Sequence, residues 1–152
     1  MLGLGSSLVT NQYREFQKRA MVFDGADDYM RGPSTATGYI SHDDGSASKI
    51  SISAWIKMDD LTSGMSAICT VYKTVSGGRE WYFVWNDLSN NLQFVISTNG
   101  TAVIQAGASP ENSINDTNWH HVVVTYDGSE GTATDRCQMY IDGSAVTTPN
   151  SG

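Results

Sequence analysis

The segment from Trp119 to Gly143 constrains the fold of this chain most strongly, because its pattern predicts two consecutive β-strands. The first runs from Trp119 to Gly128 and the second from Arg136 to Gly143, and each ends in an Asp-Gly pair. Aspartate accepts local backbone hydrogen bonds and glycine adopts positive φ, so both pairs predict turns. Apolar residues on both faces of the first strand predict that it lies inside a sheet.

Strand signals recur from Ala20 onward, with turn-forming residues between them. Alternation of apolar and polar residues within several of these segments turns one apolar face toward a core. The inward residues are expected to be Ile50, Ile52, Ala54, Ile56 and Met58; Trp81, Phe83 and Trp85; Leu92, Phe94 and Ile96; and Cys137, Met139 and Ile141. No helix of ten or more residues is expected, and the spacing predicts an all-β sandwich.

Length and charge narrow the classes of function. A chain of 152 residues has the size of one domain. Nine Lys and Arg against sixteen Asp and Glu give a net charge of −7, which repels phosphate backbones, so we expect no nucleic-acid partner. No window reaches the ~18 consecutive apolar residues that a membrane span needs, so we expect no membrane insertion.

Three segments occur in an order that resembles the laminin-G-like, concanavalin A-like jelly-roll family over residues 20–146. They are Phe23–Tyr29, Ser51–Lys57 and the Trp-His-His-Val, Tyr-Asp-Gly and Tyr-Ile-Asp-Gly motifs after residue 118. The resemblance implies a two-sheet antiparallel jelly-roll sandwich, with residues 1–19 as an N-terminal arm and residues 20–152 as the jelly-roll domain. Family members continue past the equivalent of Gly143 with strands that close the sandwich.

Only nine residues follow Gly143, so we expect the closing C-terminal strands to be missing. An uncovered sheet edge is prone to aggregate. Either the natural chain is longer, or neighbouring subunits cover the edge.

Catalytic chemistry of the hydrolase type is not predicted. Glycoside hydrolases built on this sandwich carry carboxylates alternating along one strand, because hydrolysis needs two of them at a fixed separation. The four glutamates, Glu15, Glu80, Glu111 and Glu130, are isolated from one another. We therefore assign no catalytic residue and expect the chain not to be an enzyme.

Histidines and cysteines are interpreted as structural. His120 and His121 point to opposite faces of a regular strand and cannot share one metal ion. A structural hydrogen bond is the expected role for a strand histidine after Trp119. Cys69 and Cys137 lack metal-ligand spacing, and we expect two buried thiols rather than a disulfide.

Acidic residues in predicted loops offer oxygen ligands of the kind that calcium prefers, but none fits a calcium-loop pattern. We interpret them as solvated turn carboxylates and expect no metal site and no cofactor, with a single structural calcium ion left open. The groups are Asp24, Asp27 and Asp28; Asp43 and Asp44; and Asp59 and Asp60.

If a ligand binds the open face of a sheet, the outward side chains there suit a glycan. Tyr82, Asn86 and Gln93 point outward there and offer an aromatic ring with amide groups, and Trp55 is expected to join them. Aromatic and amide side chains on a sheet more often only pack or face solvent, and this is the favoured interpretation from the sequence.

The favoured hypothesis is a non-enzymatic structural or decoration protein of a bacteriophage virion, on the capsid or tail surface. The opening Met1–Gly5 resembles small phage structural proteins, and the start lacks the charged and apolar regions of a secretory signal. Such a protein would assemble in the host cytoplasm with virion neighbours, form a homo-oligomer by strand addition, and bind a surface glycan. The alternative is a carbohydrate-binding module of a larger secreted or surface protein, with an extracellular location.

Overall fold

The computed structural model describes residues 20–24, 27–31, 49–62, 64–72, 78–97 and 99–146. The chain divides into two units, residues 1–32 and 33–152, and all the strands of the described residues belong to the second. In chain order the elements are β1 (Lys49–Ile56), β2 (Met65–Tyr72), β3 (Arg79–Asn86), β4 (Asn91–Ser97), β5 (Val103–Ala108), β6 (His120–Asp127), α1 (Ala133–Arg136), β7 (Cys137–Ile141) and β8 (Ser144–Ala145).

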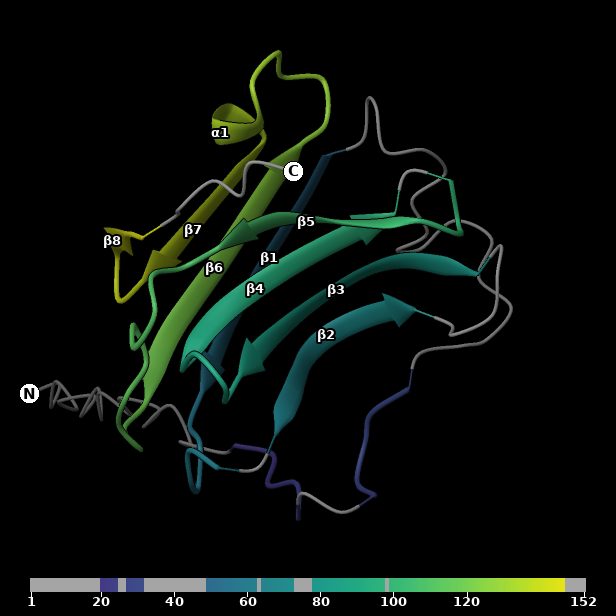
Figure 1. Ribbon diagram of the computed structural model, residues 1–152. Helices are drawn as coiled ribbons and strands as arrows, with labels where there is room; N and C mark the ends of the chain where they lie inside the picture. Colours follow the sequence, from purple (N-terminus) through teal and green to yellow (C-terminus); the bar gives the residue numbers. More distant parts are fainter. Residues whose placement is uncertain are drawn as a thin grey trace, which may run out of the picture. The chain divides into compact units, whose positions relative to one another are not determined.

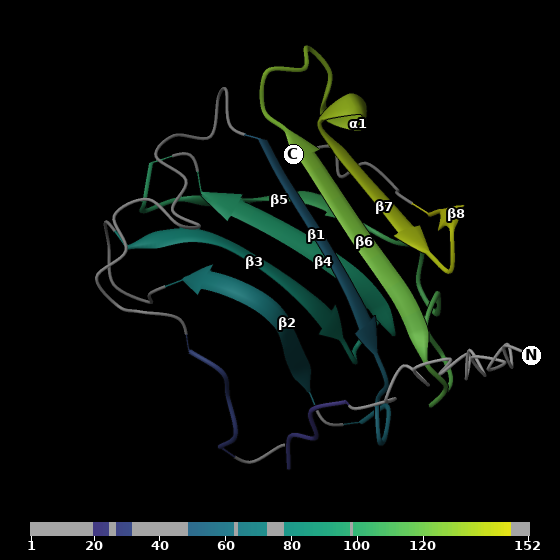
Figure 2. The ribbon, with the colours of Figure 1, turned by 180° about the vertical axis from the view of Figure 1, so that it is seen from behind.

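The strands form two antiparallel sheets of four strands each, ordered β1-β6-β7-β8 and β2-β3-β4-β5. Figures 1 and 2 show these sheets as two stacked layers, seen from opposite sides. β1 contacts β2 on one side of the sandwich and β7 contacts β5 on the other. The predicted all-β, two-sheet antiparallel sandwich is confirmed.

The core lies between the layers and is built from alternate residues, as predicted. The inward residues of β3, β4 and β7 are buried, whereas those of β1 are only partly buried because β1 lies at a sheet edge. The Phe94 ring joins the two layers: its centroid lies 6.3 Å from that of Trp81 in its own sheet and 5.8 Å from that of Tyr126 on β6. β6 lies between β1 and β7, which confirms its predicted interior place.

Three register shifts interrupt the pairing in the β2-β3-β4-β5 sheet; one lies between Val71 and Tyr72 at the end of β2, and the other two are β-bulges that change which residues share a face. Ile68 is the extra residue in β2 between Ala67 and Cys69, and Ala106 is the extra residue in β5. The second bulge sets Gly107 opposite Phe94. A Cβ atom on Gly107 would lie 2.6 Å from the Sγ atom of Cys137, so this glycine permits the close approach of β5 to β7.

The two cysteines are free, as expected. β2 and β7 lie on opposite sides of the sandwich, about three strand spacings or roughly 14 Å apart across the sheets, beyond the reach of a disulfide. Cys137 is buried, and burial raises the pKa of its thiol to about 12. Cys69 is only half-buried, so the expectation of two buried thiols holds fully for Cys137 alone.

Residues 20–24 and 27–31 form no strand, so the predicted core segment that starts at Ala20 is wrong for this part of the chain. The large apolar side chains of this segment, among them Val22 and Tyr29, are exposed. A strand forms only where a neighbour satisfies its backbone hydrogen bonds. The predicted arm, residues 1–19, lies outside the described residues, and the domain boundary at residue 20 stays a prediction.

No helix among the described residues is long and apolar enough to cross a membrane.

Candidate functional site

A hollow of about 340 Å³ lies on the outer face of the β2-β3-β4-β5 sheet, and we call it the Tyr82 hollow. Antiparallel pairing of β2 with β3 sets Ala67 opposite Val84 and Thr70 opposite Tyr82. The side chains that line it are Met65, Ala67, Thr70, Tyr82 and Val84. The lining is therefore mostly apolar, with one aromatic ring and one aliphatic hydroxyl.

Of the predicted glycan residues, Tyr82 lies in the hollow and Gln93 lies beside it, opposite Val84 on β4. The Gln93 amide donates to the Asn91 Oδ1 atom at 3.4 Å. Asn86 is on the same strand face but is only 9% exposed, and its Oδ1 atom accepts the Leu88 N–H at 3.1 Å. Asn86 thus holds the β3–β4 turn and does not present the open amide that was expected.

Trp55 does not join this group, which corrects the prediction. It lies on β1, in the other sheet, and its side chain points away from the core on that sheet's outer face. Periodicity assigned its face correctly as outward. The sheet to which each outward face belongs depends on strand order, which periodicity does not carry.

Sequence reasoning missed Met65, Ala67 and Thr70. Ala67 and Thr70 stand three residues apart, and a regular strand would put them on opposite faces. The Ile68 bulge restores them to one face. The only sequence signal for these lining residues was that small or polar residues alternate with apolar ones along β2. The bulge interrupts this alternation.

His120 connects the loop before β6 to the turn after β7, and we call this group the His120 bridge (Asp116, His120 and Asp142). Its Nδ1 atom lies 2.8 Å from Asp142 Oδ2, and its Nε2 atom lies 3.1 Å from Asp116 Oδ1. Asp142 also accepts the His121 N–H at 2.9 Å. The predicted structural role of His120 is confirmed, and the bridge explains why the Trp-His-His and Asp-Gly motifs occur together.

The Asp142-Gly143 turn is a two-residue hairpin connection with both residues at positive φ, 51° and 82°. Ile141 pairs with Ser144 across it. These angles are those of a type I′ turn, which Asp-Gly favours. The turn predicted from the Asp-Gly pair is therefore confirmed.

The His120 bridge gives stability a pH dependence. Burial by itself lowers the pKa of His120, but the hydrogen bonds to Asp142 and Asp116 outweigh it, and the net pKa is raised. A raised folded-state pKa stabilises the fold below the unfolded value of about 6.5, and that stabilisation is lost as pH rises through the folded pKa. Hydrogen bonding to His120 and to backbone N–H groups lowers the pKa of both aspartates, so they remain charged in this range.

We therefore expect the free energy of unfolding to fall as the pH rises above the unfolded-state pKa of about 6.5, and this fall to be smaller in His120→Asn. Urea denaturation of both proteins at several pH values measures the difference. His121→Asn is the matched control, because His121 lies on the other face of β6. If the free energy of unfolding falls equally steeply with pH in the wild type and in His120→Asn, the bridge is not the cause of the pH dependence.

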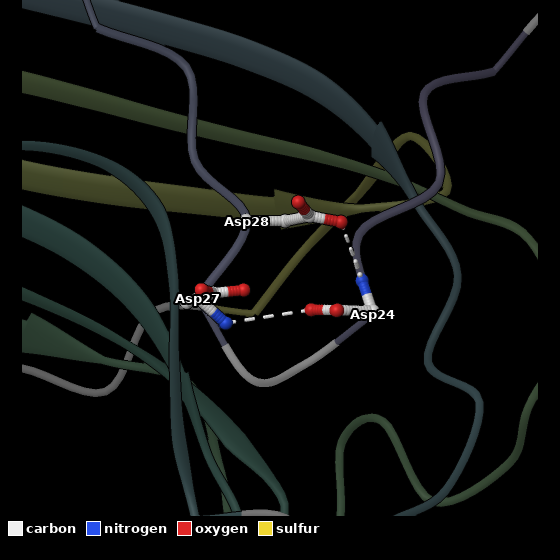
Figure 3. Close-up of side chains that lie close together, drawn as sticks. All are labelled: Asp24, Asp27 and Asp28. Carbon is white, nitrogen blue, oxygen red and sulfur yellow. Dashed lines mark hydrogen bonds between the residues drawn. The ribbon is translucent and has the colours of Figure 1, made fainter.

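Three carboxylates lie close together in the other unit. Asp24, Asp27 and Asp28 have oxygens within 4.8 Å of one another, and all three residues are exposed (Figure 3). Asp28 Oδ2 accepts the Asp24 N–H at 3.1 Å and Asp24 Oδ1 accepts the Asp27 N–H at 3.4 Å. These bonds belong to a local turn, which fits the interpretation as turn carboxylates.

The remaining acidic groups follow the same interpretation where they are described. Asp60 Oδ1 accepts the Thr62 N–H at 2.8 Å, which is a turn contact. Asp43 and Asp44 lie outside the described residues. The expectation of no metal and no cofactor, with a structural calcium ion left open, stays a prediction.

The two carboxylates at the ends of β3, Glu80 and Asp87, are too far apart to act as a hydrolytic pair. Glu80 is near the start of β3 and Asp87 follows its end, roughly 23 Å away along an extended strand. Hydrolytic pairs stand about 5–10 Å apart. The expectation that the chain is not an enzyme stays a prediction.

Together, the two stacked antiparallel sheets and the turn-fixing His120 bridge define a jelly-roll β-sandwich with an open sheet face. A laminin G sequence model, described as the concanavalin A-like lectin/glucanases superfamily, matches residues 24–152. The chain therefore belongs to the concanavalin A-like lectin/glucanases superfamily. No curated protein and no solved structure matches it.

Membership confirms the predicted family and fold. Laminin G-like folds are generally binding domains, although the superfamily also includes glucanases. The match does not support a phage origin or a virion role. Those hypotheses, with the virion location and the homo-oligomer, stay predictions.

Proposed function

We propose that this domain is a carbohydrate-binding module that takes a neutral glycan in the Tyr82 hollow. The hollow itself is the observation that carries the proposal, because it is an open concavity on a sheet face that is lined by the predicted glycan residue Tyr82 and has Gln93 beside it. Superfamily membership supports the ligand class, since the superfamily is described by lectins and glucanases.

The chemistry of the hollow suits a sugar ring. The Tyr82 ring and the side chains of Ala67 and Val84 give an apolar floor for the C–H face of a pyranose. The Thr70 hydroxyl donates to the Trp81 carbonyl at 3.3 Å, so its oxygen keeps lone pairs for a sugar hydroxyl. The net charge of −7 disfavours acidic glycans and restricts the class to neutral ones.

Tyr82→Ala should weaken glycan binding at this face at least about tenfold, because burial of one aromatic side chain contributes roughly 1.5–3 kcal/mol. A glycan array first identifies which neutral glycans bind. NMR titration with β-1,3- and β-1,4-glucan hexasaccharides then monitors the backbone amide signals of β2 and β3. Tyr82→Phe keeps the ring and should retain most of the affinity.

Leu88→Ala, at a side chain 90% exposed in the β3–β4 turn, controls for nonspecific effects of a surface change. If no neutral glycan shifts the β2 and β3 signals, or if Tyr82→Ala binds as well as the wild type there, the proposal is wrong.

A further inference from the structure

An exposed tryptophan is held in place on the outer face of the opposite sheet. Trp55 on β1 is 65% exposed and stands directly across from His121 on β6. Their ring centroids lie 5.1 Å apart with the planes 32° from parallel. The Ser53 hydroxyl lies 2.8 Å from the His121 Nε2 atom, so a hydrogen bond fixes the imidazole against which the indole rests.

The side chains around this pair are mostly uncharged and polar. Side-chain alternation along the strands and the strand register place hydroxyl and amide groups on the same outer face as Trp55. Lys49 and Asp127 form an ion pair at the end of this face farthest from Trp55. The Lys49 ammonium lowers the pKa of Asp127 to about 2, so this charge pair stays neutral overall. The residues of this surface, the Trp55 face, are Ser51, Ser53, Trp55, His121, Val123, Thr125, Gln138 and Tyr140.

Trp119 adds a second exposed aromatic ring near the same end. It directly precedes β6 and is two positions from His121, the spacing that places two side chains on one face of an extended chain. Aromatic rings beside hydroxyl and amide groups match the alternating C–H faces and hydroxyls of a sugar.

We propose that the Trp55 face is a second neutral-glycan surface, so that the two outer faces of the sandwich hold two glycan chains on opposite sides. The proposal takes its ligand class from the proposed function but depends on a different sheet and different residues. A neutral ligand fits because the charged residues lie at the two ends of this face: Lys49 and Asp127, which pair with each other, at one end, and Lys57 two positions beyond Trp55 at the other.

A protein partner, including a second copy of this chain, fits this face less well. A stable protein interface buries about 800 Å² on each partner and has an apolar centre. Around Trp55 the neighbouring outward positions on β1 and β6 are Ser53, His121 and Val123, with Ser51 and Thr125 one pair further along. Such a face offers two exposed aromatic rings, Trp55 and Trp119, in mostly polar surroundings, which suits a narrow chain more than a broad interface.

NMR titration of the full chain with the same glucan hexasaccharides tests the proposal. We expect a second set of signals, from β1, β6 and the Trp55 indole N–H, to shift and saturate independently of the β2 and β3 set. Trp55→Ala should weaken the β1 and β6 response at least tenfold and leave the β2 and β3 response unchanged. Tyr82→Ala should do the reverse, and Trp55→Phe should keep part of the response.

The outcomes separate the two proposals. A response confined to β2 and β3 overturns the second surface and leaves the proposed function standing, whereas a response confined to β1 and β6 overturns the Tyr82 hollow. No response at either face overturns both. If light scattering shows a dimer that Trp55→Ala dissociates, the face is an interface between copies and the glycan proposal for it is wrong.

Discussion

Phe94→Ala should lower the free energy of unfolding by about 3–5 kcal/mol, the range found when a buried aromatic residue is truncated. Phe94 is fully buried, and its ring lies between Trp81 of its own sheet and Tyr126 of the other. The change removes the ring that joins the two layers and leaves a cavity between them. Because small domains have about 5–15 kcal/mol of stability in total, the loss should be visible as a large shift of the denaturation midpoint.

Urea denaturation followed by tryptophan fluorescence measures this effect, since Trp81 and Trp85 are fully buried. Phe94→Leu keeps most of the volume and should cost less than half as much. Leu88→Ala, at an exposed turn position, should change stability by no more than about 0.5 kcal/mol. A Phe94→Ala cost below about 1 kcal/mol would contradict the packing described for the core.

Gly107→Ala should cost about 1–3 kcal/mol, the usual range for an overpacked core. The added methyl group would lie 2.6 Å from Cys137 Sγ and 3.2 Å from Cys137 Cβ. Alanine in place of glycine gains roughly 0.5–1 kcal/mol in backbone entropy, which the clash exceeds because Cys137 is short and buried. β5 and β7 must then move apart or the thiol must rotate.

A double-mutant cycle with Cys137→Ala isolates this contact by equilibrium denaturation. The double variant should be more stable than the sum of the two single changes predicts, because the second change removes the clashing sulfur. Gly131→Ala is the matched control: its added methyl group meets nothing within 4 Å, so stability should change little. Strict additivity in the cycle would show that the Gly107 effect does not come from Cys137.

The two-residue alternation of apolar and polar residues correctly predicted the strands in which this alternation continues without a break. β1, β3, β4 and β7 bury the faces that the apolar residues marked, because two-residue alternation on a strand follows from the backbone itself. The His120 role was predicted from the same kind of local evidence. The expectation failed at residues 20–24 and 27–31, where apolar side chains occur without a strand.

The candidate site was predicted only in part. Tyr82 lies in the hollow as expected, but its neighbours Ala67 and Thr70 reach the same face only through the Ile68 bulge. Asn86 was expected to face a ligand and instead holds a turn through its Oδ1 atom. A bulge and a side-chain turn contact are set by neighbouring strands, which the local pattern does not specify.

By itself, the sequence determined that the chain alternates between an apolar and a polar face, where its Asp-Gly turns fall, and which family it resembles. These properties are local, since they depend on residues one or two positions apart. The tertiary structure alone decided that Trp55 and Tyr82 lie on different sheets. It also decided that residue 107 must lack a side chain to leave room for Cys137. Both depend on strand order and on the distance between layers, which arise only when segments far apart in the chain pack together.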